Sequence, residues 1–334
     1  MEPSNTAPRK KKRMPLWAVI LTDVLLIGTV LIVFALFHHV LPQKGGEPVM
    51  VVTTAQSSAG ETTKAGDTTS PVSLTWKEKF AGHFTDTVVQ TADSYTSPNV
   101  SIHIQKVTTG SGNSLVTYYV ADIYIADIEC FGTYLAENTY GSGYRDTVPD
   151  MDIASGALLA MTGDYYGNSA GNNGGVVVRN GKLYRAEATD CDVGALYYDG
   201  TVQVFAPGTF DAREAVSRGV WQAWTFGPML LDADGKAMKT FNSSVTVQNP
   251  RSGFGYYEPG HYCFILVDGR QDGYSVGVTM AQYAKIFEQL GCKSAYNLDG
   301  GQSAAMTFND TFVNRPYKGG RSVSDCLIIR EVQP

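Results

Sequence analysis

Charged residues are scarce in this 334-residue chain, since Asp, Glu, Lys and Arg make up 17% of it, against about 25% in an ordinary soluble domain. The formal net charge is −6, and 43% of the residues are hydrophobic. A chain with so few charges is neither a disordered, self-solvating polymer nor a nucleic-acid-binding protein. The near-average apolar content also excludes a multi-pass membrane protein.

Metal-ligating side chains are few as well. The five histidines are scattered, the His-Glu-x-x-His pattern is absent, and no two of the five cysteines have C-x-x-C spacing. The sequence therefore favours neither a histidine-rich metal site nor a zinc knuckle or thioredoxin-like site. We predict no cofactor and leave metal dependence open. The odd cysteine count leaves at least one free thiol, and spacing does not select disulfide partners.

The N-terminus has the pattern of a membrane anchor. Five basic residues lie within residues 1–15, and a 22-residue apolar run follows from Leu16 to Phe37. Such a run is long enough to span a hydrocarbon core of about 30 Å. No small-residue cleavage site follows it, so we predict an uncleaved transmembrane signal anchor over residues 16–40. The alternative is a long signal peptide that is cut in the following linker. The basic flank predicts a cytoplasmic N-terminus and an extracytoplasmic main domain in the cell membrane.

Residues 41–75 are predicted to form a flexible Ser/Thr-rich tether. Eleven of residues 43–75 are Ser or Thr, and no helical or strand periodicity is present. The remaining domain, residues 76–334, carries a formal charge of −8. An anion bound by such an acidic domain has to be held by locally placed arginines and backbone amides.

Strand and turn signals dominate residues 76–334 and predict an α+β fold, a single domain rich in mixed β-sheet with a few helices. Strands are predicted over 100–107, 115–125, 262–267, 294–298 and 326–329. Asn180-Gly181 and Asp199-Gly200 predict two-residue hairpin turns, which need positive φ at both positions. Helical spacing predicts helices over 149–161 and, with a capping box at Thr279 and Gln282, over 279–290.

Two strands are predicted to end in an Asp-Gly pair on either side of the 279–290 helix. Asp268-Gly269-Arg270 follows the first strand, and Asp299-Gly300-Gly301 follows the second. A single Asp-Gly is best read as a plain turn. Two of them, with an arginine and a second glycine attached, favour a shared rim that presents carboxylates to a ligand.

Three arginines in nearby loops, Arg251, Arg270 and Arg321, suit phosphate binding, because guanidinium forks bind phosphate oxygens in pairs. Backbone amides at 300–302 could complete an anion-binding nest. The alternative is ordinary surface solvation or pairing with local carboxylates. The Gly/Asn/aromatic loop at 163–167 and 172–175 suits a sugar, although a glycine-rich turn is the more economical interpretation.

Ser303 lies in a sequence that half-resembles a nucleophile elbow. That arrangement needs a histidine after the serine, and none follows His261. A serine esterase is therefore the weakest of the enzymatic interpretations.

The ordered blocks of residues 150–330 resemble the phosphodiester glycosidase family. The blocks that carry the resemblance are Phe226-Gly227-Pro228, Pro250-Arg251-Ser252, Val267-Asp268-Gly269-Arg270, Asn297-Leu298-Asp299-Gly300-Gly301-Gln302-Ser303, Val313-Asn314 and Arg321. The sequence departs from the family pattern at three positions, where Thr162, Ser252 and Gln302 replace the usual residues.

The resemblance implies hydrolysis of a sugar-1-phosphodiester, such as an N-acetylglucosamine-1-phosphodiester, at the anomeric bond. It implies catalytic carboxylates at Asp299 and Asp268, with Glu137 a weaker candidate. The residues implied in phosphate or substrate binding are Arg251, Ser252, Arg270, Asn297, Gly300, Gly301, Ser303 and Arg321, with Arg145 a weaker candidate.

The architecture suits a bacterial surface protein that acts on envelope glycopolymer or exopolysaccharide. Its expected partners are a phosphorylated carbohydrate and, through the N-terminal helix, the membrane; protein partners stay open. The rival interpretation is a non-catalytic carbohydrate-binding or scaffold domain. The replacements at Thr162 and Ser252 would suit a lost activity, whereas retention of both aspartates and all three arginines argues against it.

Overall fold

The computed structural model describes residues 14–52, 74–166 and 175–332. The chain divides into two units, one ending at Pro42 and the other beginning at Gln43. The first unit contains the helix α1 (Leu16–Ala35), which continues into a π-helical turn, Leu36–Val40. Residues Leu16–His38 have a mean hydropathy of 2.7 and are long and apolar enough to cross a membrane. This helix is compatible with either a signal anchor or a single span.

The second unit begins earlier than the predicted tether allows. Two short strands, β1 (Gln43–Lys44) and β2 (Met50–Val51), pair with β8 (Gly141–Ser142) and β11 (Lys182–Ala186). Residues 43–52 of the expected tether are therefore part of the folded unit. Strand pairing at a sheet edge needs only backbone N–H and C=O groups, so side-chain periodicity did not reveal it. Residues 53–73 of the tether lie outside the described ranges.

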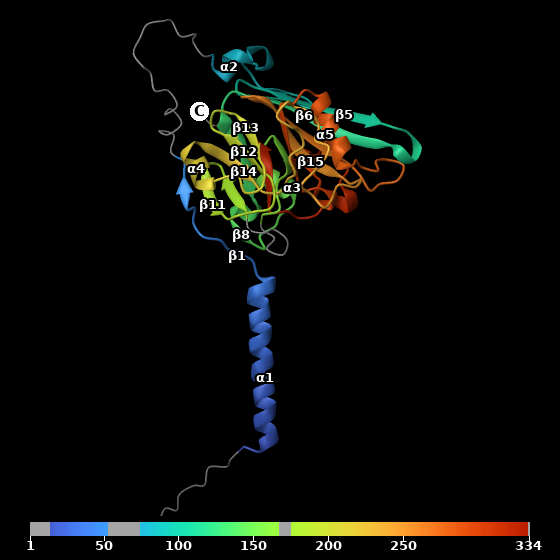
Figure 1. Cartoon of the computed structure of the whole chain (residues 1–334). Coiled ribbons are helices and arrows are strands. Elements are labelled where there is room, and N and C mark those ends of the chain that lie inside the picture. Colours follow the sequence, from blue (N-terminus) through green and yellow to red (C-terminus); the bar gives the residue numbers. More distant parts are fainter. Residues whose placement is uncertain (1–13, 53–73, 167–174, 333–334) are drawn as a thin grey trace, which may run out of the picture. The chain divides into compact units, whose positions relative to one another are not determined.

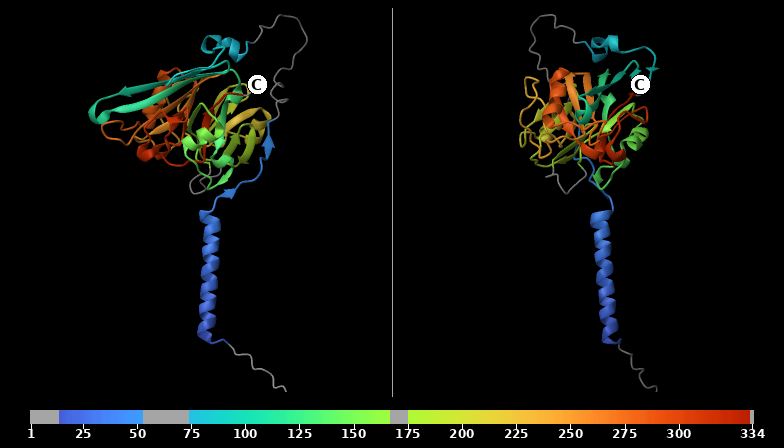
Figure 2. Two further views of the ribbon diagram at one scale, coloured as in Figure 1. Left: turned by 180° about the vertical axis from the view of Figure 1, so that it is seen from behind. Right: turned by 90° about the vertical axis from the view of Figure 1, so that its right-hand side faces the viewer.

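The largest sheet has seven antiparallel strands in the order β17-β15-β16-β6-β5-β4-β3. Its strands β5, β6 and β15 are labelled in Figure 1. The sheet includes the long β5–β6 hairpin, whose tip projects beyond the neighbouring elements (Figure 2). The strands of this sheet are β3 (Val89–Gln90), β4 (Ser94–Thr96), β5 (Val100–Thr109), β6 (Val116–Ile125), β15 (Arg251–Glu258), β16 (His261–Val267) and β17 (Ser294–Leu298).

Besides the two-stranded β1–β8 sheet, two antiparallel sheets of six and five strands complete the sheets of the described residues. One has the order β13-β12-β14-β10-β11-β2, and the other β19-β18-β9-β20-β7. Their further strands are β7 (Phe131–Leu135), β9 (Leu159–Thr162), β10 (Val176–Arg179), β12 (Val193–Tyr197), β13 (Val202–Phe205), β14 (Val220–Trp224), β18 (Met306–Phe308), β19 (Thr311–Phe312) and β20 (Asp325–Ile329).

The main core lies where the three sheets meet. Rings from different sheets pack together there, including Phe131 against Phe264 at 5.4 Å and Trp224 against Phe254 at 5.0 Å between centroids. Burying such large rings supplies much of the driving force for folding. The helices α3 (Val148–Ser155), α4 (Ala212–Ser217) and α5 (Met280–Gln289) each cover the face of a sheet. A short helix, α2 (Trp76–Lys79), precedes the first sheet.

The sheet-rich α+β class predicted from the sequence is confirmed, as are the predicted strands and α5. Thr279 forms the expected capping box with Gln282, and Gly291 has the positive φ of a helix-ending residue. These signals are local and are decided by a few neighbouring residues, which explains why the sequence reveals them.

The helix predicted over 149–161 is wrong in its second half. The helix α3 ends at Ser155, because Gly156 adopts a left-handed conformation with φ 63°. Residues 159–162 instead form β9, which is buried between two strands of the five-stranded sheet. The apolar spacing of this stretch fits both structures, and tertiary pairing decides between them.

Of the two predicted hairpin turns, one is confirmed. Asn180 and Gly181 both have positive φ and join β10 to β11. At the second turn Gly200 has positive φ and Asp199 does not. The Tyr197 N–H donates to the Thr201 carbonyl there, so the turn encloses three residues, 198–200. The Asp199 carboxylate accepts hydrogen bonds from the backbone N–H and the hydroxyl of Thr201 and stabilises this turn.

Candidate active site

The two predicted Asp-Gly endings do share one rim of the seven-stranded sheet. Strand β15 lies between β16 and β17, and its first residues pair with the last residues of both neighbours, Arg251 with Val267 and Ser252 with Leu298. Asp268 and Asp299 therefore leave the sheet at the same end, on either side of Arg251. The antiparallel register creates this arrangement from segments almost fifty residues apart.

A cavity of about 720 Å³ opens at this rim. Its walls come from the start of β15, the end of β17 and the first residue of α5. Further wall residues lie in the loops after β9, β11, β14 and β16, in the turn after β17 and in the segment that precedes β15. The residues that line it include six predicted site residues, Arg251, Arg270, Asn297, Asp299, Gly300 and Gly301, together with Tyr165, Asp190, Cys191, Phe226, Phe241, Asn242 and Asn249.

Asp299 is a buried carboxylate at the wall of this cavity, 6% exposed. Its Oδ2 lies 3.1 Å from Nη2 of Arg321, whose side chain is 43% exposed. Arg321 also donates from Nε to the Ser303 hydroxyl at 2.5 Å. Burial raises the pKa of Asp299, while hydrogen bonding to Ser303 and the charge of Arg321 oppose the rise. Ser303 is fully buried and serves Arg321 as an acceptor.

Arg251 is a buried cation without a carboxylate partner among the described residues. Its guanidinium donates to three backbone carbonyls, those of Val245, Val247 and Val278, at 2.9, 2.5 and 3.4 Å. Burial, with a smaller contribution from the nearby charge of Arg270, lowers the pKa of Arg251 to about 10. A buried cation that is satisfied only by neutral carbonyls leaves positive potential in the cavity.

Arg270 contributes a second cation to the same cavity. Its Nε and Nη2 donate to Oδ1 of Asn249 at 3.0 and 2.7 Å, and its guanidinium lies over the ring of Tyr317. No carboxylate within the described ranges forms an ion pair with it. Two neighbouring arginines that lack counter-charges make this cavity suited to an anion.

The glycines after Asp299 act differently from the predicted anion nest. The Gly301 N–H donates to the Pro250 carbonyl at 3.0 Å, and the Gly300 N–H is directed to the Asp299 carboxylate. A Cβ on Gly300 would lie 2.7 Å from the Pro250 carbonyl oxygen, and one on Gly301 would lie 3.1 Å from Nη2 of Arg270. Glycine is thus needed here for close packing of the Asp299 loop against β15 and Arg270, and at least two of the nest amides are already engaged.

Asp268 shares the rim but its carboxylate is used within the protein. It accepts hydrogen bonds from the Tyr274 hydroxyl at 2.8 Å, from Nδ2 of Asn314 at 2.8 Å and from the Arg315 N–H at 3.1 Å. Burial raises the pKa of Asp268, and these donors oppose the rise. Asp268 is absent from the residues that line the cavity. The contacts of its carboxylate join the loop after β16 to the segment after β19.

Of the remaining predicted residues, Asn297 lines the cavity, and Ser252, Glu137 and Arg145 do not. Asn297 lines it and donates to the Gly227 carbonyl at 2.7 Å, while its buried Oδ1 has no partner in the described structure. Ser252 is buried on the strand without lining the cavity. Glu137 is exposed on a turn with φ 53° and does not line the cavity either. Arg145 is exposed, and its guanidinium lies over the Tyr165 ring.

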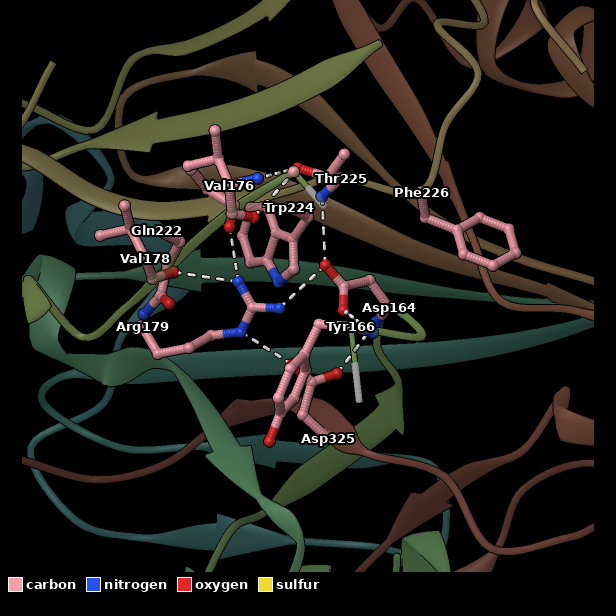
Figure 3. Close-up of polar contacts among 12 residues, drawn as sticks. Asp164, Tyr166, Val176, Val178, Arg179, Gln222, Trp224, Thr225, Phe226 and Asp325 are labelled. Atoms are coloured by element: carbon pink, nitrogen blue, oxygen red, sulfur yellow. Dashed lines mark hydrogen bonds and ion pairs between the residues drawn. The ribbon is translucent and has the colours of Figure 1, made fainter. Parts of the chain in front are cut away.

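Sequence reasoning missed two parts of this site. Tyr165, noted only as part of a glycine-rich loop, lines the cavity and covers the Arg321 guanidinium at 5.4 Å. Behind it lies a buried cluster of Asp164, Arg179 and Asp325 (Figure 3). The sequence could have indicated Arg179, because it is a charged residue at the end of an apolar strand. Residues 167–174 of the same loop lie outside the described ranges.

The arrangement supplies one cationic and one anionic pole within a single cavity. Arg251 and Arg270 can neutralise a phosphate, and Asp299 can accept a proton or stabilise a positive charge. Within the described ranges no three His, Cys, Asp or Glu side chains gather to hold a metal ion.

The sequence signature of the phosphodiester glycosidases matches residues 155–330, more than half of the chain. The chain belongs to the phosphodiester glycosidase family. It is similar to the SPbeta prophage-derived uncharacterized protein YomE of Bacillus subtilis strain 168, with 29% identity over 198 residues. That match takes in 57% of this chain and 30% of YomE, so the chain spans about a third of its relative.

The fold is similar to a solved structure from zebrafish, the catalytic domain of N-acetylglucosamine-1-phosphodiester alpha-N-acetylglucosaminidase auto-inhibited by its pro-peptide. The TM-score is 0.57 at 21% identity, over 73% of this chain and 87% of the zebrafish domain. At this identity the likeness extends to the fold alone.

Proposed function

We propose that this chain hydrolyses sugar-1-phosphodiesters at the anomeric carbon–oxygen bond. The observation that carries the proposal is the cavity in which two arginines without carboxylate partners, Arg251 and Arg270, accompany the buried carboxylate of Asp299. Family membership and the activity for which the zebrafish protein is named support the same reaction.

In the proposed reaction the phosphate lies against Arg251 and Arg270. Water attacks the anomeric carbon, the bond from that carbon to the phosphate oxygen breaks, and the phosphate leaves as a phosphomonoester. Because a phosphate is a good leaving group and the arginines neutralise it, strong acid assistance is not needed. Asp299, ionised beside Arg321, stabilises the developing positive charge on the sugar or accepts the proton of the attacking water.

Asp299 is the one predicted catalytic carboxylate that we retain for this role. Asp268 and Glu137 do not line the cavity, and the described contacts of Asp268 are structural. Asn297, with a free buried amide oxygen at the wall, is proposed to position a sugar hydroxyl. The rings of Tyr165, Phe226 and Phe241 provide apolar surface for the sugar.

We further propose that the apolar helix holds the enzyme at the cell membrane, with its N-terminus in the cytoplasm. The domain would then face phosphorylated envelope glycopolymer or exopolysaccharide. The basic residues before the helix support this orientation.

The test is incubation of the detergent-solubilised full chain with a panel of sugar-1-phosphodiesters, N-acetylglucosamine-1-phosphodiester included, followed by assay of free sugar and phosphomonoester. Product is expected from at least one compound, and Asp299→Asn should reduce kcat/KM by at least about 100-fold. Asp152→Asn is the matched control, because Asp152 is as buried as Asp299 and does not line the cavity.

Equal activity of the wild type and Asp299→Asn would remove Asp299 from the mechanism. Saturable binding of the same compounds without any product would favour the carbohydrate-binding interpretation.

A further inference from the structure

The cluster of Asp164, Arg179 and Asp325 is a fully buried group of charges behind the cavity (Figure 3). Arg179 lies 2.9 Å from the Asp164 carboxylate through Nη2 and 2.7 Å from the Asp325 carboxylate through Nε. Its Nη1 donates to the carbonyls of Val178 and Ala223. One side chain thereby joins β10, β14, β20 and the loop after β9.

Asp164 holds two backbone segments that form walls of the cavity. Its Oδ1 accepts the Tyr166 N–H at 2.8 Å, and its Oδ2 accepts the Thr225 N–H at 3.1 Å. The residues next to these amides, Tyr165 in one segment and Phe226 in the other, line the cavity. The Asp164 carboxylate therefore fixes the spacing of the two walls.

The same loop is connected to Asp299 by two routes. The Asp299 N–H donates to the Gly163 carbonyl at 3.0 Å. The Tyr165 ring covers the Arg321 guanidinium, which in turn pairs with the Asp299 carboxylate. Gly163 itself is held against β20, because its N–H donates to the Asp325 carbonyl at 3.1 Å and a Cβ would collide with the Asp325 side chain.

We propose that Asp164, Arg179 and Asp325 form a positioning unit, which sets the orientation of Asp299 and Arg321 without touching the substrate. The inference rests on the proposed function and adds to it residues that belong to neither the phosphate pole nor the sugar walls. Burying three charges is costly, and a well-packed apolar cluster would stabilise the fold at least as well. Its hydrogen bonds instead serve the backbone on both sides of the cavity.

Asp164→Asn is the most specific perturbation. Asparagine keeps the shape and one acceptor oxygen, but its amide nitrogen faces either a backbone N–H or the Arg179 guanidinium, which are both donors. One wall of the cavity is then released. Phosphate binding by Arg251 and Arg270 does not depend on this carboxylate, because their described partners lie elsewhere.

The expected result in the full-length chain is a fall in kcat of ten- to a hundredfold with KM within about threefold of the wild type. The acidic limb of the pH profile of kcat/KM, where activity falls as Asp299 is protonated, should also move to higher pH. Arg321 is the charged side chain in hydrogen-bonding range of Asp299, and loosening that pair raises the pKa of Asp299. Asp152→Asn, a buried carboxylate outside the unit, is expected to change neither kcat nor the limb.

A readout that needs no activity separates this inference from the proposed function. In Asp164→Asn, amide hydrogen exchange is expected to accelerate in peptides that cover 163–166, 225–227 and 299–303 and to stay unchanged in β5 and β6. If the wild type cleaves no phosphodiester but this pattern appears, the proposed function fails and the positioning unit stands. If exchange at 299–303 is unchanged, the positioning unit is refuted whatever the activity.

If Asp164→Asn unfolds, Tyr165 provides the second test. Tyr165→Leu removes the ring from Arg321 and leaves the charged cluster intact, and Tyr165→Phe is its control because it keeps the ring. The leucine variant should move the acidic limb to higher pH, and the phenylalanine variant should not. Identical limbs in both variants and the wild type would refute the route through Arg321.

Discussion

The ion pair between Arg321 and Asp299 offers a sharp test of how the carboxylate is tuned. Arg321→Gln keeps a long polar side chain that can still reach the Ser303 hydroxyl, and it removes the positive charge 3.1 Å from Oδ2 of Asp299. Burial already raises the pKa of Asp299, and Arg321 opposes that rise. Without the arginine the pKa of Asp299 rises further, so the carboxylate loses its proton only at higher pH.

The size of the effect follows from the distance and the exposure of the pair. In a medium as polar as water, two unit charges about 3 Å apart attract each other by about 1.4 kcal/mol, and a drier site increases this several-fold. Because the Arg321 side chain is 43% exposed, water screens the pair, and its attraction is close to the lower of these values. About 1 to 1.4 kcal/mol corresponds to a five- to tenfold change in the ionised fraction of Asp299 on its acidic limb.

The assay is the pH dependence of kcat/KM for the best sugar-1-phosphodiester. Relative to its own plateau, Arg321→Gln should lose five- to tenfold more activity than the wild type at a pH on the acidic limb. Arg145→Gln is a suitable control, since Arg145 contacts Tyr165 and makes no contact with Asp299 in the described structure. An acidic limb that does not move in Arg321→Gln would refute the assignment of that limb to Asp299.

Three further outcomes are expected. Burial raises the pKa of Asp152 to about 6, so the protonated carboxyl contributes its full stability below about pH 4 and this contribution is lost as the pH rises through 6. In denaturant unfolding at pH 8, Asp152→Asn should therefore be more stable than the wild type by up to about 3 kcal/mol. At pH 4 no such gain is expected. Cys191 is the one cysteine that is not buried, and it lines the cavity. Iodoacetamide should therefore inactivate the wild type, and the Cys191→Ser variant should resist inactivation. Equal inactivation of both proteins would place the reactive group elsewhere. Inorganic phosphate should raise the Tm of the wild type in a saturable manner and raise that of Arg270→Gln much less; the same rise in both would argue against a phosphate at Arg270.

Much of the candidate site could be predicted because its residues lie next to strand ends that the sequence reveals. The apolar runs before Asp268 and Asp299 indicate where two strands stop, and the antiparallel register then brings both ends to one rim. The role of each carboxylate could not be predicted in this way. Asp268 is engaged by Asn314 and Arg315, which are distant in sequence, and only the folded structure shows these donors.

The charged cluster behind the cavity was not predictable for the same reason. Asp164, Arg179 and Asp325 belong to three separate segments, and each is unremarkable as a turn or strand-end residue. Their meeting depends on how β9, β10 and β20 are placed, which local patterns do not specify. Local ambiguity also explains the error at 159–162, where an apolar run fits a helix and a buried strand equally well.

The most direct test of the central claim is the position of bond cleavage. Hydrolysis by the full-length wild type in water enriched in ¹⁸O, followed by mass spectrometry of both products, identifies the atom that water attacks. Attack at the anomeric carbon predicts ¹⁸O in the released sugar and none in the phosphomonoester. Incorporation of ¹⁸O into the phosphate would mean that the phosphorus–oxygen bond is broken, and would contradict a phosphodiester glycosidase reaction at this site.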